Sequence, residues 1–227
     1  MLKIYYTDVS DLPDQTDGLI LSDYRKAKIA SCRDVRMRKQ QIGAELLLLW
    51  TLRQEGIRKL PPVISVLPGG KPVLQDIALE FSLSHSGALA ACAISDRPVG
   101  LDLERKGRYH ESLLRRCFSP EEQHTIRESL EPDAVFTELW TGKESMLKLT
   151  GTGIRDNLSQ VHPLEPDPKL RIWHTWIPPG AGDEILPIAD RRRYQLSVCF
   201  HAAIPEPESL RFVPAGAFLD VFGKTAL

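Results

Sequence analysis

The stretch Val99-Gly100-Leu101-Asp102-Leu103-Glu104 combines three apolar side chains with two carboxylates and predicts a short β-strand. Successive side chains of a strand point to opposite faces, so Asp102 and Glu104 share one face while the leucines share the core-facing side. Two carboxylates held side by side without a cation repel each other. The pair therefore indicates either a solvated strand end, which the basic residues that follow would suit, or a site for a positive ion.

A second stretch, Trp140-Thr141-Gly142-Lys143-Glu144-Ser145-Met146-Leu147-Lys148, lies in a segment with helical periodicity. Trp140, Glu144 and Lys148 are spaced four residues apart and form one stripe along the predicted helix. As an exposed ion pair, Glu144 and Lys148 would contribute only about 0.2–0.5 kcal/mol. The tryptophan argues against full exposure, and buried charged groups need partners. The stripe is thus either an ordinary salt bridge or part of a functional site.

Together the two stretches contain the groups that could hold a magnesium ion against a pyrophosphate. Asp102, Glu104 and Glu144 supply hard oxygen ligands, and phosphate oxygens of a substrate would complete the shell of the ion. Lys143 and Lys148 would offset phosphate charge that the metal leaves uncovered. Lys143 lies off the stripe that contains Glu144, so we expect it to have a supporting role only.

The order and spacing of these stretches resemble the signature of the 4'-phosphopantetheinyl transferase superfamily, in its longer single-chain, two-halves (surfactin-synthetase-activating) type. That signature is an apolar-Gly-apolar-Asp-x-Glu segment followed, some forty residues later, by Trp-x-x-Lys-Glu-(Ala/Ser)-x-x-Lys; here Lys143 lies 41 positions after Asp102. Three further segments are similar to family segments: GKP at 70–72, FSLSHSG at 81–87 and CFSPEE at 117–122. The resemblance covers roughly residues 22–153.

For the fold, the resemblance implies an α+β protein made of two similar α+β halves related by a pseudo-twofold axis, with the active site in the cleft between them. The break at Arg97-Pro98 suggests the boundary. Residues 1–97 would form an N-terminal half that contacts the nucleotide of coenzyme A, and residues 98–227 a C-terminal half with the metal and the catalytic helix. We expect a monomer, that is, a pseudo-dimer in one chain.

For the function, the resemblance implies Mg²⁺-dependent transfer of 4'-phosphopantetheine from coenzyme A to a serine of an apo acyl carrier or peptidyl carrier protein, with release of 3',5'-ADP. Asp102, Glu104 and Glu144 would hold the metal, and Asp102, Glu144 and Lys148 would be the catalytic residues. Lys148 would contact the transferring phosphoryl oxygens or the leaving group. Glu144 is one candidate base for the serine, and a bridging water or substrate-assisted transfer is an equal alternative.

Binding of the coenzyme A nucleotide would need further positively charged side chains. By position, Arg25 and Lys28 resemble family residues that grip the 3'-phosphate of coenzyme A, although a solvated basic face also explains such a cluster. Lys71, His85 and Ser84 lie in the family-like segments and are expected to bind phosphate together with Lys148. For His85 the plain alternative is a satisfied histidine at a strand end.

Two rival functions share this inventory of residues. Another Mg²⁺-dependent phosphoryl-transfer enzyme, such as a phosphodiesterase, would explain the carboxylates but not the Gly-Lys-Pro and Ser-His-Ser segments. A noncatalytic carrier-protein binder on the same fold would not need Asp102, Glu104, Glu144 and Lys148 intact. The carrier could belong to fatty acid, polyketide or nonribosomal peptide biosynthesis, and exposed residues after Arg105 and around Phe118 are the expected determinants of carrier choice.

Composition limits the class of protein. The 227 residues carry a net charge of −1, which predicts no general attraction to nucleic acid or membranes. The sequence contains no run of 18 apolar residues, so we expect no membrane-spanning helix. The first ten residues lack the layout of a signal peptide, and the four cysteines are scattered without a Cys-x-x-Cys pair. We therefore expect a cytoplasmic protein without structural zinc.

Hydrophobic periodicity and punctuating residues predict the other elements. One long helix is expected within residues 25–56, and a second from Pro132 to Gly151 with Asp133 as its N-cap. A capping box should start a helix at Ser119 and Pro120. Strands are expected at residues 1–9, 63–67, 80–83, 88–94, 99–103, 170–177, 194–200 and 209–213, and the last dozen residues are expected to fray.

Overall fold

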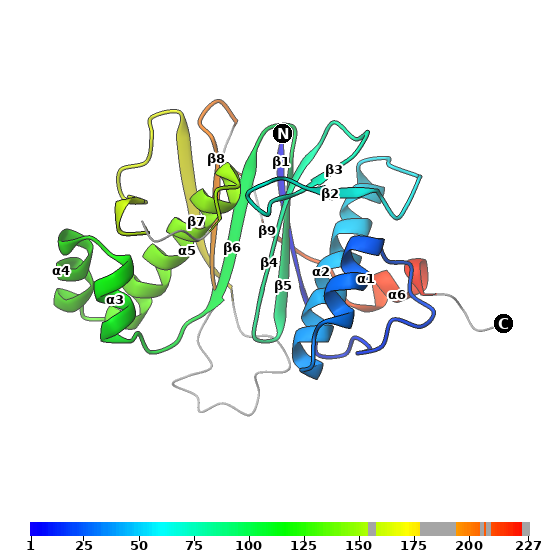
Figure 1. Cartoon of the computed structure of the whole chain (residues 1–227), viewed down its shortest axis with the longest axis horizontal. Helices are drawn as coiled ribbons and strands as arrows, with labels where there is room; N and C mark the ends of the chain where they lie inside the picture. Colours follow the sequence, from blue (N-terminus) through cyan, green and yellow to red (C-terminus); the bar gives the residue numbers. More distant parts are fainter. Residues whose placement is uncertain (154–157, 178–193, 205–206, 208–209, 224–227) are drawn as a thin grey trace.

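The computed structural model describes residues 1–153, 158–177, 194–204, 207 and 210–223. Strands occupy the middle of the molecule, with α1, α2 and α6 on one side of them and α3, α4 and α5 on the other (Figure 1). The mixture of helices and largely antiparallel strands confirms the α+β class. No helix in the described part of the chain is both long and apolar enough to cross a membrane.

The first sheet has the strand order β4-β5-β1-β9. Its strands are β1 (Leu2–Asp8), β4 (Glu80–Ser86), β5 (Leu89–Ser95) and β9 (Leu210–Phe212). β5 pairs antiparallel with both of its neighbours, whereas β9 runs parallel to β1. The edge strand β4 carries the Ser-His-Ser segment and packs beside residues 99–105.

Helix α2 (Val35–Gln54) covers the outer face of this sheet, and α1 (Asp23–Ala30) packs against α2 (Figure 1). The sequence prediction of one long helix within 25–56 is confirmed for α2, while α1 is a separate helix capped by Ser22. The middle of α2 is buried on all sides because it packs against the sheet and against α1 and α6 (Gly216–Phe222). A small hairpin of β2 (Ile64–Val66) and β3 (Pro72–Leu74) stands beside α1.

The second sheet has the order β6-β8-β7, with antiparallel pairing throughout. It consists of β6 (Val99–Arg105), β7 (Leu170–Ile177) and β8 (Tyr194–His201). Its inner face shares one hydrophobic core with the first sheet, because Leu101, Leu103 and their neighbours on β8 pack against residues of β1 and β5. Its other face is covered by α5 (Pro132–Thr150).

Shorter helices complete this half: α3 (Glu111–Cys117), α4 (Pro120–Glu128) and the 3-10 turn η1 (Leu158–Gln160). The capping box at Ser119 and Glu122 is confirmed. The N-cap prediction for α5 was wrong: Glu131 occupies that position, and the Asp133 carboxylate instead accepts the backbone N–H of Tyr109. The end of α5 is as expected, since Gly151 takes the left-handed conformation at φ 72°.

The two sheets meet where β4 runs beside β6, and serine side chains bridge them. Ser82 Oγ accepts the buried N–H of Leu101 at 2.9 Å, and Ser84 Oγ donates to Asp102 at 2.9 Å. Ser86 Oγ donates to Glu104 at 2.8 Å. Side chains two apart on a strand share a face, so this serine row lines up with the carboxylate row of β6. The junction between the sheets therefore carries the acidic pair of the sequence motif.

The C-terminal segment crosses back to the first half. β9 joins the first sheet beside β1, and Phe218 and Phe222 of α6 are buried in the core beneath α2. The expectation that the last dozen residues fray was wrong for α6, while residue 209 of the expected last strand lies outside the described residues. The division at residues 97 and 98 stays a prediction, and this exchange means that a cut there would leave neither part with its full core.

Candidate functional site

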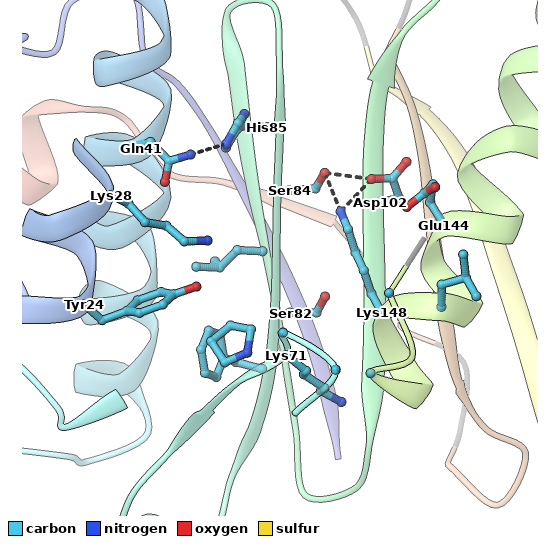
Figure 2. A pocket seen from close by; sticks show the side chains of 18 of the residues that line it. Tyr24, Lys28, Gln41, Lys71, Ser82, Ser84, His85, Asp102, Glu144 and Lys148 are labelled. Atoms are coloured by element: carbon cyan, nitrogen blue, oxygen red, sulfur yellow. Dashed lines mark hydrogen bonds and ion pairs between the residues drawn. The ribbon is translucent and has the colours of Figure 1, made fainter. Parts of the chain in front are cut away.

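A cleft of about 500 Å³ opens between the two sides of the molecule. Its walls come from α1, α2, β4, β6, α5 and the loop at residues 69–72 (Figure 2). With the exception of Lys143, the residues that the sequence analysis assigned to the metal, the chemistry or the nucleotide line this cleft: Arg25, Lys28, Lys71, Ser84, His85, Asp102, Glu104, Glu144 and Lys148. Side chains up to 123 positions apart in the sequence are thus brought to one place.

Gly100 explains how α5 reaches the acidic strand. Gly100, Asp102 and Glu104 alternate along β6 and so share the face that meets α5. A Cβ atom on Gly100 would collide with the carbonyl oxygen of Ser145 and the backbone of Leu149. The glycine of the sequence motif therefore permits the close helix–strand contact that sets the α5 side chains against the carboxylates.

Asp102, Ser84 and Lys148 form a triangle at the floor of the cleft (Figure 2). Lys148 Nζ donates to Asp102 Oδ1 at 2.6 Å and to Ser84 Oγ at 3.0 Å, and the serine hydroxyl donates to the same Oδ1 at 2.9 Å. Asp102 is 4% exposed. One oxygen of this buried carboxylate is thus fully engaged, and Lys148 is held at the acidic wall.

Glu104 and Glu144 complete the acidic wall from two different elements. Burial and the neighbouring Asp102 charge raise the pKa of Glu104 to about 7. The same two causes, in the same order, raise the pKa of Glu144 to about 7. Two carboxyls that are reluctant to ionise beside a third indicate a place where negative charge accumulates without enough compensating positive charge.

Two buried oxygens of this wall have no hydrogen-bond partner among the described residues: Asp102 Oδ2 and Glu144 Oε1. Unpaired buried carboxylate oxygens are costly, and a hard cation would satisfy them. Among the described residues, however, no group of three or more acidic, histidine or cysteine side chains surrounds a common point. The donor chemistry fits Mg²⁺ that takes part of its shell from substrate oxygens, but the three carboxylates do not form a closed cage by themselves.

Lys143 does not belong to the cleft, contrary to the expectation that it offsets phosphate charge. Its side chain is fully buried on another side of α5, where Nζ lies 2.8 Å from Glu122 Oε2. It also donates to the carbonyl oxygens of Leu158 at 3.0 Å and Val161 at 2.5 Å. Burial lowers the pKa of Lys143, with Glu122 acting in the opposite sense. Its supporting role is structural: it ties α4 and η1 to α5.

The wall opposite the carboxylates is basic. Lys28 is exposed on α1, and its Nζ lies 4.8 Å from the centre of the Tyr24 ring, which also lines the cleft. Arg25 is buried at 5% exposure, and its guanidinium already donates to Glu45 at 3.4 Å and to the Gln41 side-chain oxygen. These internal bonds argue against Arg25 as a freely available phosphate ligand, whereas Lys28 remains at the surface of the cleft.

His85 and Lys71 lie between the basic and the acidic walls. Gln41 Nε2 lies 2.8 Å from His85 Nε2 (Figure 2). Burial, followed by the charges of Arg25 and Lys148, lowers the pKa of His85 to about 4. Lys71 Nζ donates to the carbonyl oxygen of Leu149 at 2.9 Å, so it also caps the end of α5.

Sequence reasoning missed two residues of the basic wall. Tyr24 directly precedes the basic cluster of α1 and lines the cleft. An aromatic side chain next to basic residues could have indicated a surface that binds a nucleotide. Gln41 lies on α2 without any motif, and its contact with His85 joins residues 44 positions apart. No local pattern in the sequence could have found it.

Comparison with known proteins agrees with this geometry. The model of the 4'-phosphopantetheinyl transferase superfamily matches residues 98–199. The 4'-phosphopantetheinyl transferase psf-1 of Bacillus pumilus is 41% identical over 93 residues, which cover 40% of each chain. HetI of Nostoc sp., also named a 4'-phosphopantetheinyl transferase, is 43% identical over 94 residues, or 37% of this chain and 40% of its own.

A longer alignment links the chain to the 4'-phosphopantetheinyl transferase ffp of Bacillus subtilis, which is 28% identical over 162 residues, covering 67% of this chain and 72% of that protein. The chain therefore spans 40% of the length of each of the first two relatives and 72% of the length of the third. Residues 98–199, which hold the three carboxylates and Lys148 of the cleft, are therefore similar to the 4'-phosphopantetheinyl transferase superfamily.

Proposed function

We propose that this protein transfers 4'-phosphopantetheine from coenzyme A to a serine hydroxyl of an apo carrier protein and releases 3',5'-ADP. One observation carries the proposal: a single cleft joins a wall of three carboxylates with unpaired buried oxygens to a wall of cations that suits a nucleotide. Names of the relatives agree with this reaction.

In the proposed reaction the serine oxygen attacks the phosphorus that bears the pantetheine arm. A P–O bond forms there while the bond to the bridging oxygen of the pyrophosphate breaks, and that oxygen leaves with 3',5'-ADP. Asp102, Glu104 and Glu144 would hold Mg²⁺, which when bound neutralises phosphate charge. Lys148, held beside Asp102 and Ser84, is placed to donate to phosphate oxygens that gain charge.

The serine must also lose its proton. Glu144 is a suitable acceptor near neutral pH in the metal-free protein, because its pKa is raised to about 7. A bound cation would lower this proton affinity. A bridging water or a phosphate oxygen of the substrate therefore remains an alternative acceptor.

For the nucleotide, we assign the 3'-phosphate to Lys28 and place Tyr24 beside it. Lys71, Ser84 and His85 are the polar groups between Lys28 and the acidic wall, and the pyrophosphate would extend along them. We also propose that residues 1–97 and 98–227 are two halves related by a pseudo-twofold axis, each with one long helix on a sheet. The cleft between such halves needs no second copy, so we expect a monomer.

A second groove offers a place for the carrier protein. It has a volume of about 460 Å³ and shares His85 with the main cleft. Arg36, Arg105 and Lys106 make it basic, and the exposed Met37 adds an apolar contact. An acidic carrier surface with an apolar residue would match it. Phe118 itself is buried at 1% exposure, so only exposed residues around it are left as expected determinants of carrier choice.

The test is incubation of the protein with several apo carriers, coenzyme A and Mg²⁺, followed by intact-mass measurement of the carriers. A mass gain equal to one phosphopantetheine group, lost when EDTA is added, supports the proposal. Hydrolysis of coenzyme A without carrier modification would favour the rival phosphoryl-transfer enzyme. Binding of a carrier without any reaction would favour the noncatalytic binder.

A further inference from the structure

Three polar side chains form a continuous chain from the buried side of α1 to the cleft. Arg25 donates through Nη1 to the side-chain oxygen of Gln41. The other end of the Gln41 amide, Nε2, lies 2.8 Å from Nε2 of His85 (Figure 2). Arg25 is itself held in place by Glu45, whose carboxylate accepts from Arg25 Nε at 3.4 Å. Glu45 is fully buried and also accepts the N–H of Ser22 at 2.9 Å.

The direction of these hydrogen bonds follows from the chemistry of the groups. A guanidinium carries only donors, so the atom of Gln41 that faces Arg25 must be the amide oxygen. The amide NH₂ then faces His85 and needs an acceptor there. A ring nitrogen can accept only when it carries no proton, so Nε2 of His85 is unprotonated in this arrangement.

We propose that Gln41, oriented by Arg25, is a positioning residue that holds the His85 imidazole in its neutral form with the proton on Nδ1. A second proton on Nε2 would point at the NH₂ of Gln41. Rotation of the amide cannot relieve that conflict, because it would turn NH₂ toward the donors of Arg25. The Arg25–Gln41 pair therefore keeps His85 uncharged and fixes its tautomer.

The charges around His85 act in the same direction. Arg25 and Lys28 from α1 and Lys148 from α5 all disfavour an imidazolium, and burial is the largest cause of its low pKa. The remaining charged residues of the two hollows that His85 lines are Lys71, Asp102, Glu104 and Glu144 in the cleft, and Arg36, Arg105 and Lys106 in the groove. Of these acidic groups, Asp102 is paired with Lys148, and Glu104 with the hydroxyl of Ser86.

One consequence rests on the proposed function. If coenzyme A binds in the cleft, His85 meets its phosphates as a neutral imidazole, and the positive charge must come from the lysines. The orientation of the ring would then be set before the nucleotide arrives. The sequence motif Ser-His-Ser supplies the histidine, while the fixed tautomer depends on a helix residue outside every motif.

The test is the tautomer of His85 in the free protein, measured by long-range ¹H–¹⁵N correlation NMR with the resonances assigned through His85→Gln. The expected wild-type pattern at pH 7 is a neutral ring with a protonated Nδ1. A ring protonated on Nε2, or an imidazolium at pH 7, overturns the proposal. This result needs neither coenzyme A nor a carrier, so it stands or falls separately from the proposed function.

Two variants of Gln41 sharpen the test. Gln41→Glu keeps an acceptor for Arg25 but offers His85 a carboxylate, so Nε2 should gain a proton and the His85 pKa should rise by about 1–3 pH units. Gln41→Leu removes the hydrogen bond to His85 and should yield a mixture of tautomers.

Gln40→Glu is the matched control: it adds the same charge one residue away, where the side chain contacts Gly87, and should leave the Nδ1-protonated form dominant. An unchanged tautomer and pKa in both Gln41 variants overturns the proposal; if either variant fails to fold, the wild-type spectrum still decides.

Discussion

The Nζ atom of Lys143 lies 2.8 Å from Oε2 of Glu122, and neither side chain of this ion pair has more than 3% of its surface exposed. The same ammonium lies 5.2 Å from the centre of the Phe118 ring. Lys143 and its neighbour Glu144 thus serve different purposes, because adjacent helix positions point about 100° apart. Lys143 holds α4 and η1 against α5, while Glu144 faces the cleft.

Lys143→Met should therefore lower stability rather than catalysis alone. Removal of one partner leaves the Glu122 carboxylate buried without its cation, at a cost of about 3–5 kcal/mol in the free energy of unfolding. Urea denaturation followed by circular dichroism measures this loss. Lys26→Met is the control, since Lys26 and its partner Asp23 are both exposed and their pair should contribute under about 1 kcal/mol.

The double variant Lys143→Met with Glu122→Gln should recover part of the lost stability, because it removes the orphaned charge. Equal stability of Lys143→Met and wild type would show that the pair is dispensable, and the structural role given to Lys143 would then be wrong.

The serine row between the sheets predicts two different effects from chemically identical changes. Ser82→Ala leaves the buried N–H of Leu101 unpaired and should cost about 1–3 kcal/mol of stability. Ser84→Ala removes a hydroxyl that bridges Asp102 and Lys148 at the cleft, where water can replace it. Its expected effect is a ten- to hundredfold slower transfer, equivalent to roughly 1.5–3 kcal/mol for a hydrogen bond to a charged group.

Thermal melting and carrier modification by intact mass, measured on both variants, separate these effects. A Ser84→Ala protein that melts early but reacts at the wild-type rate per folded molecule would contradict the assignment of Ser84 to the site.

Local patterns predicted the elements that carry the site, and long-range packing decided what those patterns could not. The alternation in Val99–Glu104 and the four-residue spacing from Trp140 to Lys148 follow from backbone geometry alone, so both elements and the faces of Asp102 and Glu144 were predictable. The direction of Lys143 was not, because it depends on which face of α5 meets α4. The need for Gly100 likewise appears only when α5 packs on β6.

The return of β9 to β1 and the bond between Gln41 and His85 depend on partners far away in the sequence. No periodicity within either segment names its partner. The same limit affected Arg25, where a basic cluster on α1 could be seen but the buried acceptor Glu45 could not be assigned to it.

Lys28 and Arg25 should respond differently to the 3'-phosphate. Lys28→Ala should weaken binding of coenzyme A about tenfold or more, the loss of a charged hydrogen bond, and leave dephospho-coenzyme A binding nearly unchanged. Arg25→Lys should lower stability and weaken both ligands alike, because Arg25 is bonded inside the protein. Calorimetric titration with the two ligands makes the comparison. A selective loss for coenzyme A in Arg25→Lys would return Arg25 to the role of a direct phosphate contact.

Acid should destabilise the protein in part through His85. Its pKa is lowered from 6.5 to about 4 in the folded state, so below pH 6.5 the unfolded chain takes up a proton that the folded protein does not. Stability from this group is present above pH 6.5 and is lost as the pH falls toward 4. Between pH 7 and 5 the expected loss is on the order of 1–2 kcal/mol. Urea unfolding of wild type and His85→Gln across this range isolates the contribution, and parallel pH profiles would contradict it.

Glu144→Gln separates the chemistry of the cleft from support of the helix. The change keeps the shape and helix propensity of the side chain but removes its negative charge. An exposed Glu144–Lys148 pair would contribute under about 1 kcal/mol, and its loss would hardly matter. Here Glu144 is 8% exposed, has one unpaired buried oxygen, and lies with Asp102 on the acidic wall.

We therefore expect Glu144→Gln to melt at or above the wild-type temperature, because repulsion with Asp102 and Glu104 is relieved. Carrier binding should persist, while transfer should fall by about two to three orders of magnitude or more, as electrostatic groups in a water-poor site typically show. Lys148→Met should show a similar loss of transfer with weaker coenzyme A binding in addition. Melting temperature and intact mass of the carrier are measured for each variant at several Mg²⁺ concentrations. Wild-type activity in Glu144→Gln would reduce the stripe to an ordinary salt bridge and remove the acidic wall from the mechanism.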